Sequence, residues 1–342
     1  MSEMVFDFGN AWAKWYNPRS KLYGSFMHAI APLSENDWTR IARRGSPPEG
    51  IAKINGKPFA FGSAARRHTI QERPRGAARY RDIYYGVALA YSLSECLQRT
   101  DANVRVCGSH APIDIDYAIN LREAVFGQWE VESRHGYSAF NVRDVMTFDE
   151  PLGGYSHYVF TERGEERRSN PLAERYTLTI DVGGYTVDVV AVDPGGQIDI
   201  MSAHSTRTGV IDLLKGFESE LRSNNAALFQ DTPDLDIRRV ENALMSGQYH
   251  FGKVELDCAN EAVAAINSLV FDVTQVINAA GGVANFDVML LTGGGAALIY
   301  EALCTALPSV EFVMAERERE LMKYANVFGG AKLSALLKRM GV

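Results

Sequence analysis

The chain has 342 residues, of which 46% are hydrophobic and 23% are charged, proportions typical of soluble globular proteins. This length predicts one or two domains with a well-buried interior. No stretch approaches the ~20 uninterrupted apolar residues that a membrane-spanning helix needs. The first residues, MSEMVFDFGN, lack the basic and apolar regions of a cleavable signal. We therefore expect a soluble, cytoplasmic protein with no membrane partner.

The net charge of −7 gives no overall attraction to nucleic acid. Arginines cluster between residues 64 and 81, but such a cluster is more often a solvated face than a polyanion site, so no direct nucleic-acid binding is expected. The cysteines are widely spaced and form no CxxC pair, which favours reduced thiols over a metal site or disulfides. They are Cys96, Cys107, Cys258 and Cys304.

The first half of the chain predicts β-hairpins followed by alternating helices and strands. Asn55-Gly56 lies between apolar alternations and is a strong hairpin-turn signal. Elsewhere the period of the apolar residues distinguishes helix from strand. The predicted strands are 3–8, 22–31, 51–61, 104–108, 126–133 and 139–148, the predicted helices are 80–98 and 117–125, and a Gly-Gly pair at 153–154 and a charged linker at 162–170 follow.

The second half repeats the opening pattern, with a strand at 176–182, a glycine turn and a second strand at 186–192. Alternating strands and helices in two related halves are typical of the α/β class. We place the boundary so that the two predicted lobes are 1–165 and 166–342, with a terminal helix that can cross back to the first lobe. The remaining predictions are a turn at 194–196, helices at 209–222, 235–245 and 259–280, a buried strand at 287–291, and helices on both sides of 310–314.

One short element occurs in both halves and carries the main chemical signal. Asp7 and Asp181 each end an apolar strand and precede a glycine-bearing turn and a second β segment. Glycine lets the backbone approach a phosphate and point N–H groups at it, while the aspartate can hold a hydrated Mg²⁺. A single Asp-x-Gly triplet is usually a plain turn. Two copies in matching places predict a triphosphate that is clamped from both sides.

A third element, residues 290–297, is a buried strand that runs into Gly293, Gly294 and Gly295 and then a helix. These glycines would let a base or ribose lie flat on the backbone, and the helix N-terminus offers N–H groups to an anion. The segment is not a P-loop, because the Gly-Lys-Ser/Thr ending is missing. It also lacks the acidic ribose-binding residue of a dinucleotide fold. Alone, such a segment is more often a tight strand-to-helix turn.

Taken together and in this order, the elements resemble the superfamily of actin, sugar kinases and large heat-shock-chaperone ATPases, over nearly the whole chain. The resemblance is narrower with the ParM-like and archaeal actin-like group. The chain is similar to that group in its length, in residues 108–131 and in residues 147–155. The resemblance implies two ribonuclease-H-like lobes of actin type with the nucleotide in the cleft between them. The matching segments are 7–10 and 181–188 for the two phosphate loops, 293–296 for the adenosine motif and 324–331 for the second connecting helix.

The resemblance also implies the cofactors and the roles of individual residues. The cofactors are ATP or GTP with Mg²⁺, and Asp7 and Asp181 hold metal-bound water. Glu150 positions the attacking water, in competition with its neighbour Asp149. Tyr185 replaces the usual Thr or Ser of the second loop, so Thr186 is the candidate hydroxyl donor. The other candidate nucleotide-binding residues are Gly9, Asn10, Ala11, Lys14, Gly183, Gly184, Thr208, Gly209, Arg238, Glu241, Gly293, Gly294, Gly295 and Ala296.

Three of these assignments have open alternatives. Lys14 could reach the β-phosphate or be a surface residue of the hairpin. Residues 208–209 could offer backbone donors to the nucleotide or only cap the helix that follows. Arg238 and Glu241 share a helix face, like a pair that relatives use on ribose and base, although a solvated salt bridge is more common.

Three functions use this fold. The first is a polymerising ATPase or GTPase that forms cytoskeletal filaments of itself, in the manner of plasmid-segregating actins with a DNA-bound adaptor protein. The second is a small-molecule kinase, although such enzymes usually need a larger substrate lobe. The third is a membrane-linked scaffold, because the basic ending at 331–340 is amphipathic, although such a short ending is more often a docked terminal helix. A chaperone is not expected, since no substrate domain follows the ATPase pattern.

Overall fold

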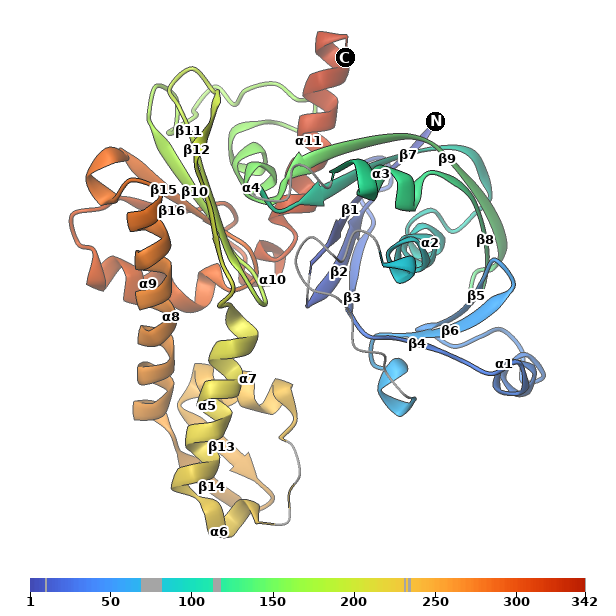
Figure 1. The fold of residues 1–342 in the computed structure, drawn as a ribbon, viewed down its shortest axis with the longest axis horizontal. Coiled ribbons are helices and arrows are strands. Elements are labelled where there is room, and N and C mark those ends of the chain that lie inside the picture. The colour runs from blue at the N-terminus through green and yellow to red at the C-terminus, as the bar shows by residue number, and fades with distance from the viewer. Residues whose placement is uncertain (10, 69–81, 113–117, 231, 233–234, 342) are drawn as a thin grey trace. The chain divides into compact units, whose positions relative to one another are not determined.

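The structure is a computed structural model that describes residues 1–342 except 10, 69–81, 113–117, 231, 233–234 and 342. It divides into two compact units (Figure 1). Unit 1 is Met1–Pro171 together with Tyr324–Val342, and unit 2 is Leu172–Lys323. The division falls a few residues after the expected boundary, and the terminal helix belongs to unit 1. Asn10 and the arginines at 73, 75, 79 and 81 lie outside the described residues.

Unit 1 is built on one nine-stranded sheet. Its strands are β1 (Ser2–Phe8), β2 (Trp12–Tyr16), β3 (Tyr23–Met27), β4 (Ile30–Pro32), β5 (Ile51–Ile54), β6 (Lys57–Phe61), β7 (Asp101–His110), β8 (Gly127–Ser133) and β9 (Gly136–Asp149). Its helices are α1 (Glu35–Ala42), the short η1 (Ala65–Arg67), α2 (Ile83–Leu97), α3 (Ala118–Val125), α4 (Glu150–Val159) and α11 (Ala325–Met340). The strand order is β3-β2-β1-β7-β9-β8-β5-β6-β4, with β1, β7 and β9 as parallel neighbours.

The curved part of this sheet encloses α2 (Figure 1). Residues 85–96 of α2 are all buried, as expected for a helix that is apolar on every side. The predicted hairpin at 51–61 is confirmed, since β5 and β6 pair across Asn55 and Gly56, whose φ angles of 46° and 78° are those of a tight hairpin turn.

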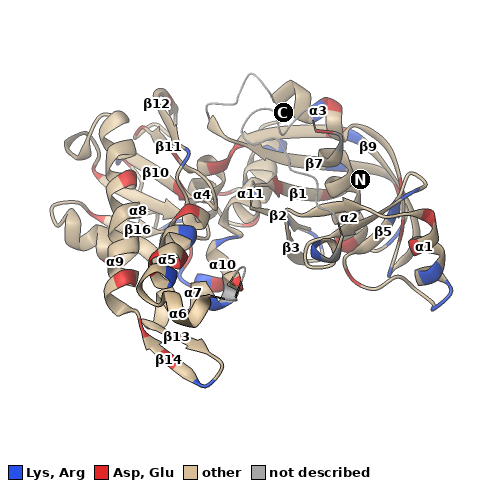
Figure 2. Cartoon of the chain, turned by 60° about the horizontal axis from the view of Figure 1, so that its bottom comes forward, with Lys and Arg blue, Asp and Glu red and all other residues tan. Residues whose placement is uncertain are grey.

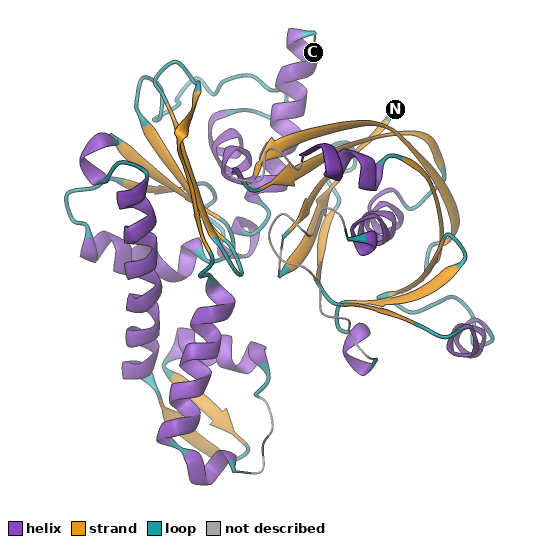
Figure 3. Cartoon of the chain, in the orientation of Figure 1, coloured by secondary structure: helices purple, strands orange, loops and turns teal. Residues whose placement is uncertain are grey.

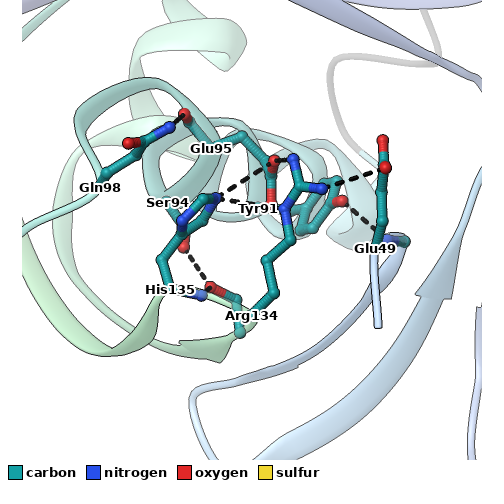
Figure 4. A network of polar contacts seen from close by, with 9 residues as sticks. Glu49, Tyr91, Ser94, Glu95, Gln98, Arg134 and His135 are labelled. Carbon is teal, nitrogen blue, oxygen red and sulfur yellow. Dashed lines mark hydrogen bonds and ion pairs between the residues drawn. The ribbon is translucent and has the colours of Figure 1, made fainter. Parts of the chain in front are cut away.

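A polar network fastens the turn between β8 and β9 to the C-terminal part of α2 (Figure 4). Arg134 donates to Glu95 Oε2 at 2.5 Å and to Glu49 Oε2 at 3.0 Å. His135 Nε2 lies 3.5 Å from the same oxygen of Glu95. Because Glu95 is buried, its charge requires these partners, and the network therefore fixes α2 relative to the curved sheet.

Two helices of unit 1, α4 and α11, cross at glycines. A Cβ on Gly329 would lie 1.6 Å from the carbonyl oxygen of Gly153, and a Cβ on Gly153 would lie 2.7 Å from the Asn326 carbonyl oxygen. The sequence placed the pair at 153–154 before an apolar stretch, whereas both glycines lie inside α4. The helical cost of glycine is offset here because only glycine permits the close approach of α11.

Unit 2 is built on a five-stranded sheet with the order β12-β11-β10-β15-β16, drawn in orange in Figure 3. The strands are β10 (Thr177–Val182), β11 (Val187–Val192), β12 (Ile198–Thr206), β15 (Val288–Thr292) and β16 (Phe312–Met314), with a separate hairpin of β13 (Gln248–Phe251) and β14 (Val254–Asp257). The helices are α5 (Val210–Asn224), α6 (Ala226–Phe229), α7 (Ile237–Ser246), α8 (Ala259–Ala279), η4 (Val283–Asn285), α9 (Ala296–Ala306) and α10 (Arg319–Met322).

Among the helices in the described part of the chain, α8 alone is long and apolar enough to cross a membrane by length and composition. Core helices of soluble proteins pass the same test of length and composition. Here α8 packs against α5, α9 and β12 of its own unit.

The two sheets share one topology. In each, three strands in chain order pair antiparallel, and two later strands then add in parallel to the first of the three. The matching orders are β3-β2-β1-β7-β9 in unit 1 and β12-β11-β10-β15-β16 in unit 2. This confirms the prediction of an α/β chain made of two related, ribonuclease-H-like halves.

Candidate functional site

In unit 1, the candidate residues gather at the turn between β1 and β2. Asp7 is buried and pairs in register with Lys14 on β2. Lys14 Nζ lies 2.7 Å from Asp7 Oδ2, and Ser109 Oγ donates to Asp7 Oδ1 at 3.0 Å. The Lys14 side chain is only 15% exposed. Lys14 is therefore a largely covered ion-pair partner of Asp7 rather than a solvated residue of the hairpin surface.

Two further carboxylates lie at the same edge of the unit 1 sheet, because the carboxyl ends of β1, β7 and β9 coincide there. His110 ends β7 and stands opposite Asp149 at the end of β9. Glu150 is the next residue and the first of α4, and its side chain is buried. In α/β sheets, ligands bind at the carboxyl ends of parallel strands, so Asp7, Asp149 and Glu150 occupy the expected place for a site.

The environments of Asp149 and Glu150 differ. His110 Nδ1 lies 3.2 Å from Asp149 Oδ1 and 3.0 Å from the Ala111 carbonyl oxygen. Burial raises the pKa of Asp149 above its ordinary value, and the charge of His110 opposes that rise. Asp149 thus lies beside His110 at the N-cap of α4, and Glu150 is the first residue of that helix, where the N-terminal partial positive charge favours a carboxylate.

In unit 2, the corresponding aspartate is Asp181 at the end of β10. It is buried, pairs in register with Asp188 on β11, and pairs on its other side with Thr292 on β15. Thr186 Oγ1 donates to Asp188 Oδ2 at 2.8 Å. The predicted hydroxyl donor therefore belongs to the same hairpin as the predicted metal-site carboxylate.

The glycines of unit 2 let three segments converge on this hairpin. A Cβ on Gly293 (φ 85°) would lie 2.1 Å from Asp181 Oδ1, so only glycine fits there. The Gly295 amide donates to the Val182 carbonyl oxygen at 2.9 Å. A Cβ on Gly209 would lie 2.6 Å from the Tyr185 amide nitrogen. Because these three residues are glycines, the ends of β10 and β15 and the start of α5 can come into backbone contact.

The N-terminus of α5 is bonded directly to the turn. The Val210 amide donates to the Gly183 carbonyl oxygen at 3.1 Å, and the Ile211 amide donates to the Gly184 carbonyl oxygen at 2.7 Å. These two N–H groups have no partner within their own helix. Gly209 is the N-cap, and its amide donates to Asp212 Oδ2 at 3.3 Å, so residues 208–209 at least cap α5.

The turns of the two units match residue by residue. Phe8 pairs with Ala13 across the first turn, and Val182 pairs with Val187 across the second. In each turn, a Cβ on the first glycine would lie 3.0 Å from a carbonyl oxygen on the far side of the turn, that of Trp12 for Gly9 and that of Thr186 for Gly183. Lys14 and Asp188 therefore occupy equivalent positions beside Asp7 and Asp181.

The other predicted residues fall into two groups. Ala11 belongs to the first turn, Gly294 is exposed beside Gly293, and Ala296 begins α9 next to that glycine loop. Glu241 is exposed on α7, which packs against α5, α8 and β13. The structure describes no contact between Glu241 and the turns, and the side chain of Arg238 lies outside the described residues.

Sequence reasoning missed two residues near the turns. Lys215 on α5 lies with its Nζ 6.0 Å from the centre of the Tyr185 ring, a position set by the backward tilt of helical side chains. His28, directly after β3, contacts the first turn. Neither belongs to a sequence motif; α5 brings Lys215 to the second turn, and the pairing of β3 with β2 brings His28 to the first.

Metal ligation at these turns is limited to isolated carboxylates. In the described ranges, no group of three or more His, Cys, Asp or Glu side chains is placed to hold a metal ion.

The cysteines are free thiols, and burial raises the pKa of Cys96 and Cys107. Lys, Arg, Asp and Glu are interspersed over both units (Figure 2).

The fold is that of actin-like proteins. Residues 179–305 match the family model of the C-terminal domain of archaeal MreB-like actin homologues, while no curated protein sequence matches the chain significantly. The predicted resemblance to ParM-type and archaeal actins is confirmed at the level of the fold.

Three solved structures illustrate this similarity. The archaeal actin homologue Ta0583 superposes with a TM-score of 0.76 at 16% identity, covering 99% of this chain and 100% of that one. The apo psk41 ParM protein has a TM-score of 0.68 at 17% identity, with coverage of 99% and 98%. Bacillus thuringiensis ParM with ATP has a TM-score of 0.71 at 14% identity, with coverage of 99% of both chains.

Proposed function

We propose that this chain is a nucleotide-dependent ATPase of actin type that assembles into filaments. The observation that carries the proposal is the duplicated hairpin. In both units a buried aspartate ends a strand of the sheet, a glycine turn of the same length follows, and a polar residue stands opposite the aspartate. Such turns bind phosphates through backbone N–H groups, so each unit offers one turn of the kind that a nucleotide phosphate needs.

The residues fit a hydrated Mg²⁺ bound with a nucleotide. Mg²⁺ usually keeps several waters and is bound through one or two carboxylates and the phosphates of the substrate, not through a cage of protein ligands. Asp7 and Asp181 supply one buried carboxylate each. Gly293 is packed against Asp181, and the next residue, Gly294, is exposed, so ribose or base can approach the backbone of this loop closely at Gly294.

The chain's own groups then have distinct tasks. When bound, the metal ion neutralises charge on the phosphates. Asp7 and Asp181 accept hydrogen bonds from water, and Lys14 holds a positive charge beside Asp7 at the first turn. Thr186 orients the second turn through Asp188. Glu150 positions a water for in-line attack, at the sheet edge where β1 and β9 end.

Solved structures with this fold support the proposals of nucleotide binding and of filament assembly. Structures with this fold include Ta0583 in complex with ADP and Bacillus thuringiensis ParM with ATP and with AMPPNP. A non-polymerisable mutant of pCBH ParM is among them, so assembly is a property of that relative. We extend the proposal to a cytoplasmic filament that segregates a plasmid or other DNA through an adaptor protein.

Calorimetric titration with ATP and GTP in Mg²⁺ tests the binding. Asp181→Ala should weaken binding at least tenfold, the loss of about 1.4 kcal/mol. Asp193→Ala is the matched control, since the Asp193 carboxylate accepts a hydrogen bond from the Gln197 amide within the turn after β11. Equal affinities of wild type and Asp181→Ala would remove Asp181 from the site.

Light scattering and electron microscopy after addition of nucleotide test the assembly. Filaments above a critical concentration are the expected result. If the protein stays monomeric across salt and protein concentrations while a sugar or organic acid becomes phosphorylated, the chain is a small-molecule kinase instead.

A further inference from the structure

His28 is the residue that joins the end of β3 to the first glycine turn. Its backbone amide donates to the Ala11 carbonyl oxygen at 2.8 Å. Its ring Nδ1 lies 3.1 Å from the Gly9 carbonyl oxygen. The ring also packs on Phe8, with 4.0 Å between ring centres. One residue thus contacts the turn at three points.

The Gly9 carbonyl oxygen determines which nitrogen of the His28 ring carries a hydrogen. A carbonyl oxygen can only accept, so Nδ1 must carry the hydrogen for this contact to be a hydrogen bond. Both the neutral Nδ1–H tautomer and the protonated imidazolium meet that condition. The Gly9 carbonyl is therefore held in either charge state of the ring.

The duplicated topology shows which group of unit 2 binds the carbonyl oxygen that corresponds to that of Gly9. Ala13 pairs with Phe26 on β3, and its counterpart Val187 pairs with Thr206 on β12. Counting forward two residues from each of these partners aligns His28 with Thr208.

In unit 2 the chain continues into α5, whose Val210 amide donates to the carbonyl oxygen of Gly183, the counterpart of Gly9. In unit 1 no helix begins at this point, because β4 follows directly. The same carbonyl is held in both units, by a helix N-terminus in one and by the His28 ring in the other.

We infer that His28 is a positioning residue of the first phosphate turn, replacing the helix N-terminus that holds the equivalent turn of unit 2. The inference rests on the proposed function for its ligand, a nucleoside triphosphate. By holding the carbonyl groups of Gly9 and Ala11, His28 fixes the shape of the turn to which the proposed function assigns the phosphates. Its loss leaves the aspartate and lysine of the hairpin in place but lets the turn change shape.

Two substitutions distinguish the effect of the His28 hydrogen-bond donor from that of its aromatic ring. His28→Phe keeps an aromatic ring on Phe8 and removes the donor, whereas His28→Asn keeps a donor near the place of Nδ1 and removes the ring. Ser25→Ala is the matched control, because it removes a hydrogen bond to Tyr324 from the same strand without touching the turn. Amide hydrogen exchange of the peptide covering residues 6–16 is measured without nucleotide, and the dissociation constants of Mg-ATP and adenosine are measured by titration.

We expect faster exchange in this peptide and about five- to tenfold weaker ATP binding in His28→Phe, the effect of one lost hydrogen bond. Adenosine binding should not change, and His28→Asn should restore both properties. Exchange in His28→Phe equal to that of Ser25→Ala would overturn the positioning role. Faster exchange with unchanged ATP affinity would overturn its connection to phosphate. If the wild type binds no nucleotide while exchange still responds to His28→Phe, the proposed function fails and the positioning role stands.

Discussion

Gly293 lies directly against Asp181, so that any side chain at position 293 would enter the space of the carboxylate. A Cβ there would be 2.1 Å from Asp181 Oδ1 and 2.6 Å from the Val182 carbonyl oxygen, and the φ angle is 85°. The glycine loop at 293–295 and the turn at 183–186, which are far apart in sequence, therefore form one structural feature of unit 2.

We predict that Gly293→Ala destabilises the protein by roughly 2 to 4 kcal/mol, from the left-handed backbone and the overpacking together, and that it weakens nucleotide binding more than tenfold by displacing Asp181. Gly294→Ala is the control, because Gly294 is exposed and the nearest atom to a Cβ is Lys323 Cβ at 3.4 Å. Urea unfolding and nucleotide titration of both variants check this. Comparable behaviour of the two variants would contradict the proposed coupling.

A second prediction concerns protein stability and follows from the crossing of α4 and α11. A Cβ on Gly329 would lie 1.6 Å from the Gly153 carbonyl oxygen, which neither backbone can accommodate without moving. Gly329→Ala should cost about 3 kcal/mol or more, the upper range for overpacked sites, measured as a loss of unfolding free energy in urea. Gly216→Ala, in α5 with nothing within 4 Å of a Cβ, should instead stabilise by about 0.5 to 1 kcal/mol. Stability of Gly329→Ala equal to wild type would show that the helices separate easily.

The repeated hairpins and their glycines could be predicted from sequence because each signal is local. Aspartate, glycine and β-branched residues fix a strand and its turn within a few positions. The hairpin across Asn55 was found for the same reason. The order of the motifs then gave the fold class without any knowledge of contacts.

Other elements depend on contacts that no local pattern contains. β12 was missed because its register with β11 shifts between Val189 and Ala191, which breaks the alternation of period two. α4 was missed because its glycines oppose helix formation until α11 packs on them. His28 has no motif at all, and only the return of β3 to the turn gives it a role.

Asp149 provides a prediction on pH dependence. Burial raises its pKa in the native state, so the native protein holds this proton more tightly than the unfolded chain does. Stability must then fall as the pH rises from the unfolded pKa through the native one. Asp149→Asn removes that titration and keeps an oxygen for His110 Nδ1, so the stability of the variant relative to wild type should increase from pH 4.5 to pH 8. Urea unfolding at several pH values measures this difference, and a constant difference would mean that Asp149 has an ordinary pKa.

Glu150→Ala tests the mechanism separately from the fold. Glu150 begins α4 at the carboxyl end of β9, buried and adjacent to an aspartate that already contacts His110. If it orients water only as the phosphate bond breaks, its loss removes stabilisation of the transition state and leaves nucleotide affinity unchanged. Phosphate release should slow by roughly 10²- to 10⁴-fold, and filaments should form normally but persist longer after a single addition of nucleotide.

The parallel variant in that experiment is Asp149→Asn, which alters the neighbouring carboxylate and keeps the oxygen that contacts His110. Asp149 lies beside His110 and makes no side-chain capping bond to α4. Its substitution should therefore change hydrolysis by less than tenfold, since it touches neither water nor phosphate in this assignment. Phosphate release, filament lifetime and ATP affinity are measured for both variants. A hydrolysis defect in Asp149→Asn with normal turnover in Glu150→Ala would transfer the water-positioning role to Asp149, and weak binding in Glu150→Ala would make Glu150 a nucleotide ligand instead.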